Sequence, residues 1–143
     1  MRKMAVSPSR CFKKHLQATH RAGLMNAVSM DTAYVNLLSQ RERCEVLGWA
    51  REALGKESFV AAAFIESQEG DVVSLYRRQM DAISAHGAIP IIFQTVRLHG
   101  QADQKKIAIY QEICAGYPHV LGFELIPDSR LTERFSTRRS FVA

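Results

Sequence analysis

The chain has 143 residues, of which 47% are apolar and 23% are charged, and its formal net charge at pH 7 is +5. This composition excludes a collagenous, low-complexity or largely disordered chain. No apolar run approaches the roughly 20 residues that are needed to cross a bilayer, so we expect no membrane partner.

Short apolar runs alternate with amphipathic stretches along the chain. The apolar runs lack the polar–apolar alternation of a half-exposed strand, which is typical of parallel strands covered on both faces. The amphipathic stretches space their apolar residues by three and four, which predicts helices. In chain order we expect a helix at 9–22, a strand at 26–30, a helix at 40–54, a strand at 59–65, a helix at 71–86, a strand at 89–93, a helix at 103–115 and a strand at 120–126.

The ends of the predicted helices carry capping signals. Ser39 and Glu42 have the spacing of a capping box, in which each side chain accepts a bond from the other residue's backbone N–H. Asp71 and Asp103 are expected to cap the next two helices. Each helix is followed by a glycine, which tolerates the left-handed conformation that ends a helix. These glycines are Gly23, Gly55, Gly87 and Gly116, and their spacings of 32, 32 and 29 residues indicate a repeated strand–helix unit.

Repeated strand–helix units build a parallel sheet with right-handed crossovers. Periodicity leaves two α/β architectures open. One is part of a (β/α)8 TIM barrel with about four parallel strands and four helices, and the other is an open doubly wound sheet. No glycine-rich phosphate-binding loop follows a strand, which weakens the second. We expect a basic N-terminal segment with the first helix at 1–21, the α/β domain at 22–127, and a basic, irregular tail at 128–143.

The positive charge lies in the two flanks of this domain. Residues 1–21 hold six basic and no acidic residues, and residues 128–143 hold four basic and two acidic ones. Residues 22–127 hold 9 basic and 12 acidic residues. Because a nucleic-acid-binding domain carries its Lys and Arg on the folded surface, we expect no nucleic-acid partner.

Three segments resemble the dihydrodipicolinate synthase / N-acetylneuraminate lyase family of class I, Schiff-base aldolases. LSQRERCEVL at 38–47 is similar to that family's L-[ST]-x-x-E-R-x-x-[VI] helix start. Gly55 followed by FVAAA at 59–63 resembles the family's third strand, and QMDAISAHGA at 79–88 resembles the approach to its fourth strand. The order and spacing of the three segments agree with the family, so the resemblance implies a (β/α)8 barrel acting on a small keto acid.

The resemblance covers 22–126 and implies the part of the barrel from helix 1 to strand 5. A full barrel takes about 250 residues. We therefore expect a truncated member of the family, and the tail at 128–143 has no family likeness.

A Schiff-base aldolase needs a lysine at the C-terminal end of a barrel strand, where burial lowers its pKa. The resemblance implies that this lysine belongs to strand 6, beyond the matched part. No lysine of the chain follows a predicted strand. The lysines are Lys3, Lys13, Lys14, Lys56, Lys105 and Lys106. We expect the chain as written to lack the nucleophile.

The resemblance also assigns candidate site residues. Thr32 matches a threonine of the family's G-T-T-G-E loop, which binds the keto-acid carboxylate, although the glycines and the glutamate of that loop are replaced here. Phe123 or Glu124 takes the position of the family's proton-relay tyrosine, so the phenol is lost, and Glu124 is the candidate acid or base. Gln94 and Thr95 end one strand and Glu66 ends another, so we expect them to line the substrate site.

An arc of four strands leaves two unpaired edges, which favours a homo-oligomer or pairing through those edges. The histidines and the widely spaced Cys11, Cys44 and Cys114 show no metal-ligand spacing, so we expect no metal, no cofactor and a reducing, cytoplasmic location. Three functions remain open. The first is an aldolase-type lyase by family, the second is a non-catalytic fragment or assembly partner, and the third is a stand-alone open α/β binding domain.

Overall fold

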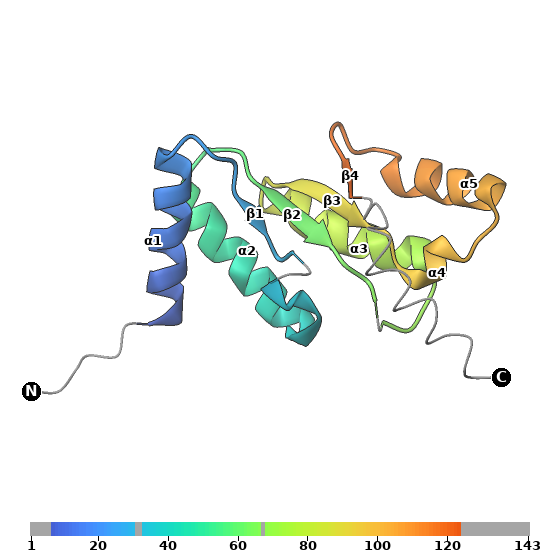
Figure 1. Cartoon of the computed structure of the whole chain (residues 1–143), viewed down its shortest axis with the longest axis horizontal. Helices are drawn as coiled ribbons and strands as arrows, with labels where there is room; N and C mark the ends of the chain where they lie inside the picture. Colours follow the sequence, from blue (N-terminus) through green and yellow to red (C-terminus); the bar gives the residue numbers. More distant parts are fainter. Residues whose placement is uncertain (1–6, 31–32, 67, 124–143) are drawn as a thin grey trace, which may run out of the picture.

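The computed structural model describes residues 7–30, 33–66 and 68–123 (Figure 1). Within them, strands alternate with helices, as the sequence predicts. The elements are α1 (Pro8–Arg21), β1 (Ala27–Val28), the 3-10 turn η2 (Val35–Leu37), α2 (Gln40–Leu54), β2 (Val60–Ala63), α3 (Val72–Ala85), β3 (Ile89–Phe93), α4 (Val96–His99), α5 (Asp103–Cys114) and β4 (Leu121–Phe123).

The four strands form one parallel sheet in the order β1-β2-β3-β4 (Figure 1). Val60 lies beside Ala27 on one side and Ile89 on the other, and Leu121 lies beside Ile91. The prediction of an α/β fold with about four parallel strands is therefore confirmed. The spatial order of the described strands follows the chain order, without the reversal at which the two halves of a doubly wound sheet meet.

The helices pack on one face of the sheet. Side chains of α1, α2, α3, α4 and α5 share a single core with Val28, Ala61, Ala63 and Ile92, which define the helix-covered face. Side chains on the opposite face form a separate cluster with Met30, Phe64 and Ile89, to which no described helix contributes. We call this opposite side the helix-free face, and its buried members are Val60, Ala62, Ile91 and Phe93.

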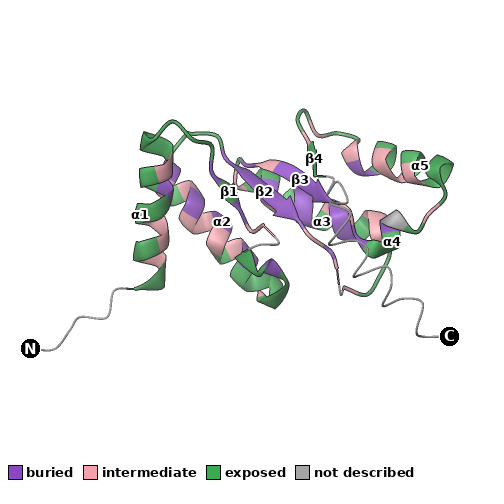
Figure 2. Ribbon diagram, in the orientation of Figure 1, coloured by how far each residue is buried: buried purple, intermediate pink, exposed green. Residues whose placement is uncertain are grey.

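Burial is greatest in the two middle strands. Figure 2 shows β2 and β3 as buried, whereas β4 and the outer surfaces of α1 and α5 are exposed. All four residues of β2 are buried, and all three of β4 are exposed. Among the described residues, no helix is long and apolar enough to cross a membrane.

Most local predictions are confirmed. The glycines at 23, 55, 87 and 116 all have positive φ, between 62° and 90°. Asp71 caps α3 by accepting the Ser74 N–H at 2.9 Å. The prediction for Asp103 is wrong, because Ala102 is the N-cap of α5 and Asp103 lies in its first turn, where it pairs with Lys106 at 3.1 Å.

The predicted capping box at the start of α2 is present. The Ser39 hydroxyl accepts the Glu42 N–H at 3.3 Å, and the Glu42 carboxylate accepts the Ser39 N–H at 2.8 Å. The pKa of Glu42 lies below its usual value of 4.5, because the Ser39 side chain and then the Ser39 backbone donate to the charged form.

The lowered pKa of Glu42 predicts a pH-dependent contribution to stability. The stabilisation is present above the unfolded-state pKa of 4.5 and is lost as pH falls through the lower folded-state pKa. Glu42→Gln is therefore expected to be less stable than the wild type in urea denaturation at neutral pH, with the difference vanishing in strong acid. Glu112→Gln, at an exposed position of α5, is the control. A difference that persists unchanged in acid would contradict the prediction.

Candidate functional site

Polar side chains gather where β2 and β3 end. Glu66 lies three residues beyond β2, and Thr95 lies two beyond β3, where it is the N-cap residue of α4. The Glu66 carboxylate accepts the backbone N–H of Val96 at 3.1 Å. This bond joins the two strand ends, because one partner follows β2 and the other follows β3.

A buried tyrosine completes this group from the helix-covered side. Tyr76 on α3 is fully buried, and its hydroxyl donates to the Phe93 carbonyl at the end of β3. Burial raises the pKa of Tyr76 to about 12, against the opposing effect of hydrogen bonding from Thr95. The Tyr76 hydroxyl therefore stays protonated at neutral pH and serves as a donor rather than as a base.

Thr95 is 2% exposed, and its Oγ1 atom has no well-formed hydrogen bond to the described part of the chain. A buried hydroxyl without a firm partner is uncommon, since desolvating it without a bond destabilises the fold by about 1–3 kcal/mol. The Thr95 hydroxyl, which lies near the Tyr76 hydroxyl, is thus the polar group of this site without a firm hydrogen bond among the described residues. We refer to Glu66, Tyr76, Gln94 and Thr95 together as the strand-end site.

The raised pKa of Tyr76 predicts late ionisation and alkaline instability. Because the folded-state pKa of about 12 exceeds the usual 10, the stabilisation is complete below pH 10 and is lost as pH rises through about 12. Replacing Tyr76 with phenylalanine should lower stability by about 1–2 kcal/mol near neutral pH, by leaving the Phe93 carbonyl without its donor.

Urea denaturation at neutral and alkaline pH tests this prediction. Tyr34→Phe, at a residue that is 70% exposed, provides the matched control and should leave stability unchanged. A Tyr76→Phe protein as stable as the wild type at pH 7 would contradict the assignment of the hydroxyl bond.

An aromatic row crosses the helix-free face at the same ends of the strands. Phe64 packs edge-on against Phe93, with ring centroids 6.3 Å apart, and Phe93 stacks on Phe123 at 4.7 Å. Phe123 was the alternative to Glu124 at the position of the family's tyrosine. Its phenyl ring packs and carries no proton to transfer.

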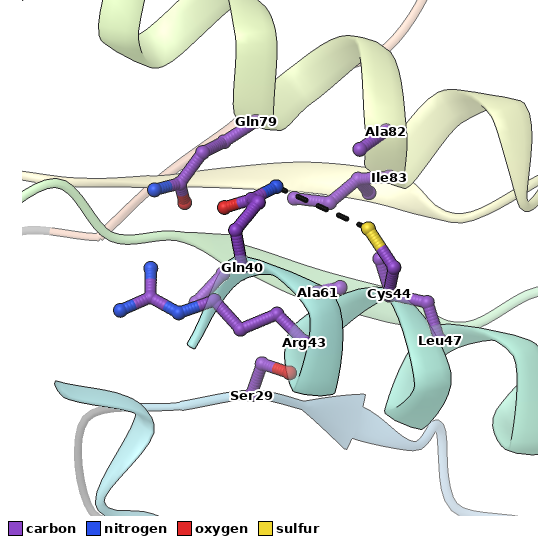
Figure 3. A pocket seen from close by; sticks show the side chains of 10 residues that line it. Ser29, Gln40, Arg43, Cys44, Leu47, Ala61, Gln79, Ala82 and Ile83 are labelled. Carbon is purple, nitrogen blue, oxygen red and sulfur yellow. Dashed lines mark hydrogen bonds between the residues drawn. The ribbon is translucent and has the colours of Figure 1, made fainter. Parts of the chain in front are cut away.

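A second group of polar residues lies between α2, α3 and the sheet (Figure 3). It surrounds a hollow of about 20 Å³, which holds about one water molecule. Arg43 Nη1 donates to the Phe64 carbonyl at 2.8 Å, and Gln79 bonds both the N–H and the carbonyl of Phe64, at 2.9 and 2.8 Å. Burial lowers the pKa of Arg43. These side chains fix the Phe64 peptide, which follows β2 and precedes Glu66 by two residues.

Arg97 fixes the loop that leads from Glu66 to α3. Its guanidinium donates to the carbonyls of Gln68, at 3.0 Å, and Gly70. Since Arg97 belongs to α4, the loop after β2 and the segment after β3 are joined a second time beside the Glu66–Val96 bond.

The structure brings part of the predicted site together. Gln94 is half-buried directly after β3, next to Thr95, and Glu66 reaches the same end of the sheet. Thr32 and Glu124 lie outside the described residues. Where the chain is described, its lysines lie in α1, in the turn after α2 and in α5, and none follows a strand. The strand-end site therefore offers donors and one carboxylate, but no amine nucleophile.

Sequence reasoning missed three residues that build the site. Tyr76 and Gln79 were not assigned to the site, and Arg43 entered only as part of the family-like motif at 38–47. Gln79 carried a usable signal, because it interrupts the apolar stripe of α3 between Tyr76 and Ile83. A polar residue inside such a stripe indicates a buried hydrogen-bonding role.

Within the described ranges, no three His, Cys, Asp or Glu side chains lie close enough to hold a metal ion. No family model matches the chain, and no curated protein or solved structure matches it either. The geometry of the strand-end site is therefore the observation from which a function is inferred.

Proposed function

We propose that the chain is an arc of a (β/α)8 barrel of the dihydrodipicolinate synthase / N-acetylneuraminate lyase kind, and that its strand-end site binds a small keto acid. One observation carries the proposal. Four parallel strands follow one another in chain order, with their helices on one face and polar side chains at their carboxyl ends. In (β/α)8 enzymes, substrates bind at that end of the strands.

The roles follow from the chemistry of each group. The Thr95 hydroxyl and the Gln94 amide donate to the keto-acid carboxylate, and Tyr76 remains protonated beside them. Glu66 holds the start of α4 through the Val96 N–H. Because no described lysine follows a strand, the chain binds the keto acid without forming an imine on these residues. Lyase chemistry would require an amine that does not belong to the described lysines.

Saturation-transfer NMR with pyruvate tests the binding. We expect transfer from the wild-type chain, weakened about fivefold in affinity by Thr95→Val, which removes one hydrogen bond of about 1 kcal/mol. Thr19→Val on α1 is the control. Absence of transfer to the wild type would contradict keto-acid binding.

Borohydride reduction tests the absence of an imine. After treatment of the full chain with pyruvate and borohydride, intact mass spectrometry should show no added mass. An adduct on a described lysine, located by peptide mapping, would show that the strand-end site is not the reacting centre.

A second candidate is a non-catalytic assembly partner, favoured by the exposed apolar side chains of β4, Leu121 and Phe123. In that case Thr95→Val would leave the saturation-transfer signal of pyruvate unchanged. We propose a cytoplasmic location for either function, supported by the three cysteines, all of which are free.

A further inference from the structure

Exposed apolar side chains concentrate at the two edges of the sheet. In the described ranges, eight large hydrophobic residues are exposed, and four of them directly precede or belong to an edge strand. Leu24 and Met25 precede β1, and Leu121 and Phe123 lie in β4. Exposed β4 contrasts with buried β2 and β3 in Figure 2. Both edges therefore have the composition of surfaces that meet another chain.

The exposed apolar side chains within the edge strands lie on the helix-free face. Leu121 lies beside Ile91, and Phe123 lies beside Phe93, both of which face away from the helices. Ala27 of β1 lies beside Val60 on the same face and is exposed. The helix-free face is thus buried at its middle strands and exposed at both ends.

We infer that two copies of the chain close into one eight-stranded parallel barrel, with β4 of each copy beside β1 of the other. A two-fold axis parallel to the strands creates both β4–β1 contacts at once and leaves no open edge. We call each of these contacts between the two copies a seam. Eight strands give an interior that side chains fill, and the helix-free face supplies them. This inference rests on the proposed barrel arc. It places the two strand-end sites on the same rim.

Charge selects this pairing over the symmetric one between two β1 edges. The helix beside β1, α1, contains four basic and no acidic residues. The helix before β4, α5, contains two basic and two acidic residues. Pairing β1 with β1 brings two α1 helices of like charge together, whereas pairing β1 with β4 sets α1 beside a neutral helix.

Pairing two β4 edges avoids that repulsion but leaves both β1 edges open. Leu24 and Met25, which are 62% and 60% exposed, would remain in water. Only the closed arrangement covers the apolar residues at both edges.

Native mass spectrometry of the unmodified chain is the first test. The expected species has twice the mass of the 16.1 kDa chain. Amide exchange of residues 121–123 and 27–28 should slow together as protein concentration rises. A single-chain mass at micromolar concentration, with exchange independent of concentration, would overturn the inference without depending on any variant.

Edge variants identify the seam. Leu121→Lys and Met25→Lys are each expected to give single chains with unchanged far-ultraviolet circular dichroism. Val96→Lys is the control, since Val96 and Leu121 are both 46% exposed and Val96 lies in α4. Mixing the two edge variants should restore a dimer, because one of its seams contains neither lysine. If Met25→Lys stays dimeric while Leu121→Lys does not, two β4 edges pair and the closed barrel is wrong.

The mass and the pyruvate measurements separate the two proposals. A single-chain mass with pyruvate binding overturns the closed dimer alone. A dimer without pyruvate binding overturns keto-acid binding and keeps the dimer.

Discussion

Replacing Arg51 with alanine is expected to lower the free energy of unfolding by about 3 kcal/mol, since several charge-assisted hydrogen bonds are lost at once. The Arg51 guanidinium donates to four carbonyls and lies over the Phe59 ring at 5.0 Å. The acceptors are His86 at 2.7 Å, Gly55 at 2.6 Å, Glu57 at 3.1 Å and Gly87 at 2.6 Å.

Two comparisons isolate the guanidinium. Arg51→Lys keeps the charge but lacks the planar fork, so it should recover less than half of the loss. Arg41→Ala, on the same helix, removes a side chain that is 87% exposed and pairs with Glu45, and it should change stability by about 0.5 kcal/mol or less. Urea denaturation gives all three values. Equal effects of Arg51→Ala and Arg41→Ala would refute the role of Arg51.

Gly87→Ala is expected to destabilise the chain by about 2–3 kcal/mol, because backbone strain adds to the displacement of the Arg51 guanidinium from the carbonyls that hold it. Gly87 has φ +70°, and an added Cβ would lie 2.6 Å from Arg51 Nη2. Gly116→Ala is the matched control. Gly116 has φ +90° with no atom within 4 Å of a Cβ, so only the strain of about 1 kcal/mol remains.

A double-mutant cycle tests the origin of the larger effect. In the Arg51→Ala background the clash is gone, and Gly87→Ala should then resemble Gly116→Ala. If Gly87→Ala has the same effect in both backgrounds, the guanidinium does not pack against Gly87 as described.

Arg51 lies at the end of the sheet where β2 and β3 begin, which is opposite to the candidate site. Gly55 and Glu57 precede β2, and His86 and Gly87 precede β3. Arg51 therefore fixes the starts of the two strands whose carboxyl ends carry Glu66 and Thr95. Loss of Arg51 is expected to loosen the register between β2 and β3.

Local signals were sufficient to predict much of the fold. The Ser39–Glu42 capping box, the apolar spacing of 40–54 and the glycine at 55 together gave α2 within its observed bounds. These features depend on residues close in sequence. The short α4 was missed, because four residues between Thr95 and Gly100 carry no periodicity.

Contacts between distant residues could not be predicted. Tyr76 reaches the Phe93 carbonyl from 17 residues away, and Arg51 reaches Gly87 from 36 residues away. Nothing near either residue in sequence identifies its acceptor. Gln94, Thr95 and Glu66 were accessible to prediction because parallel strands bring their carboxyl ends to one edge. Thr32 and Glu124 stay predictions, since they lie outside the described residues.

The most direct test of the barrel arc and its keto-acid site is a map of amide chemical shifts in the full chain during titration with pyruvate. We predict that the shifts concentrate at Glu66, Gln94, Thr95 and Val96, and that Thr95→Val reduces them. Shifts confined to the hollow beside Arg43, or the absence of any shift, would contradict a keto-acid site at the carboxyl ends of the strands.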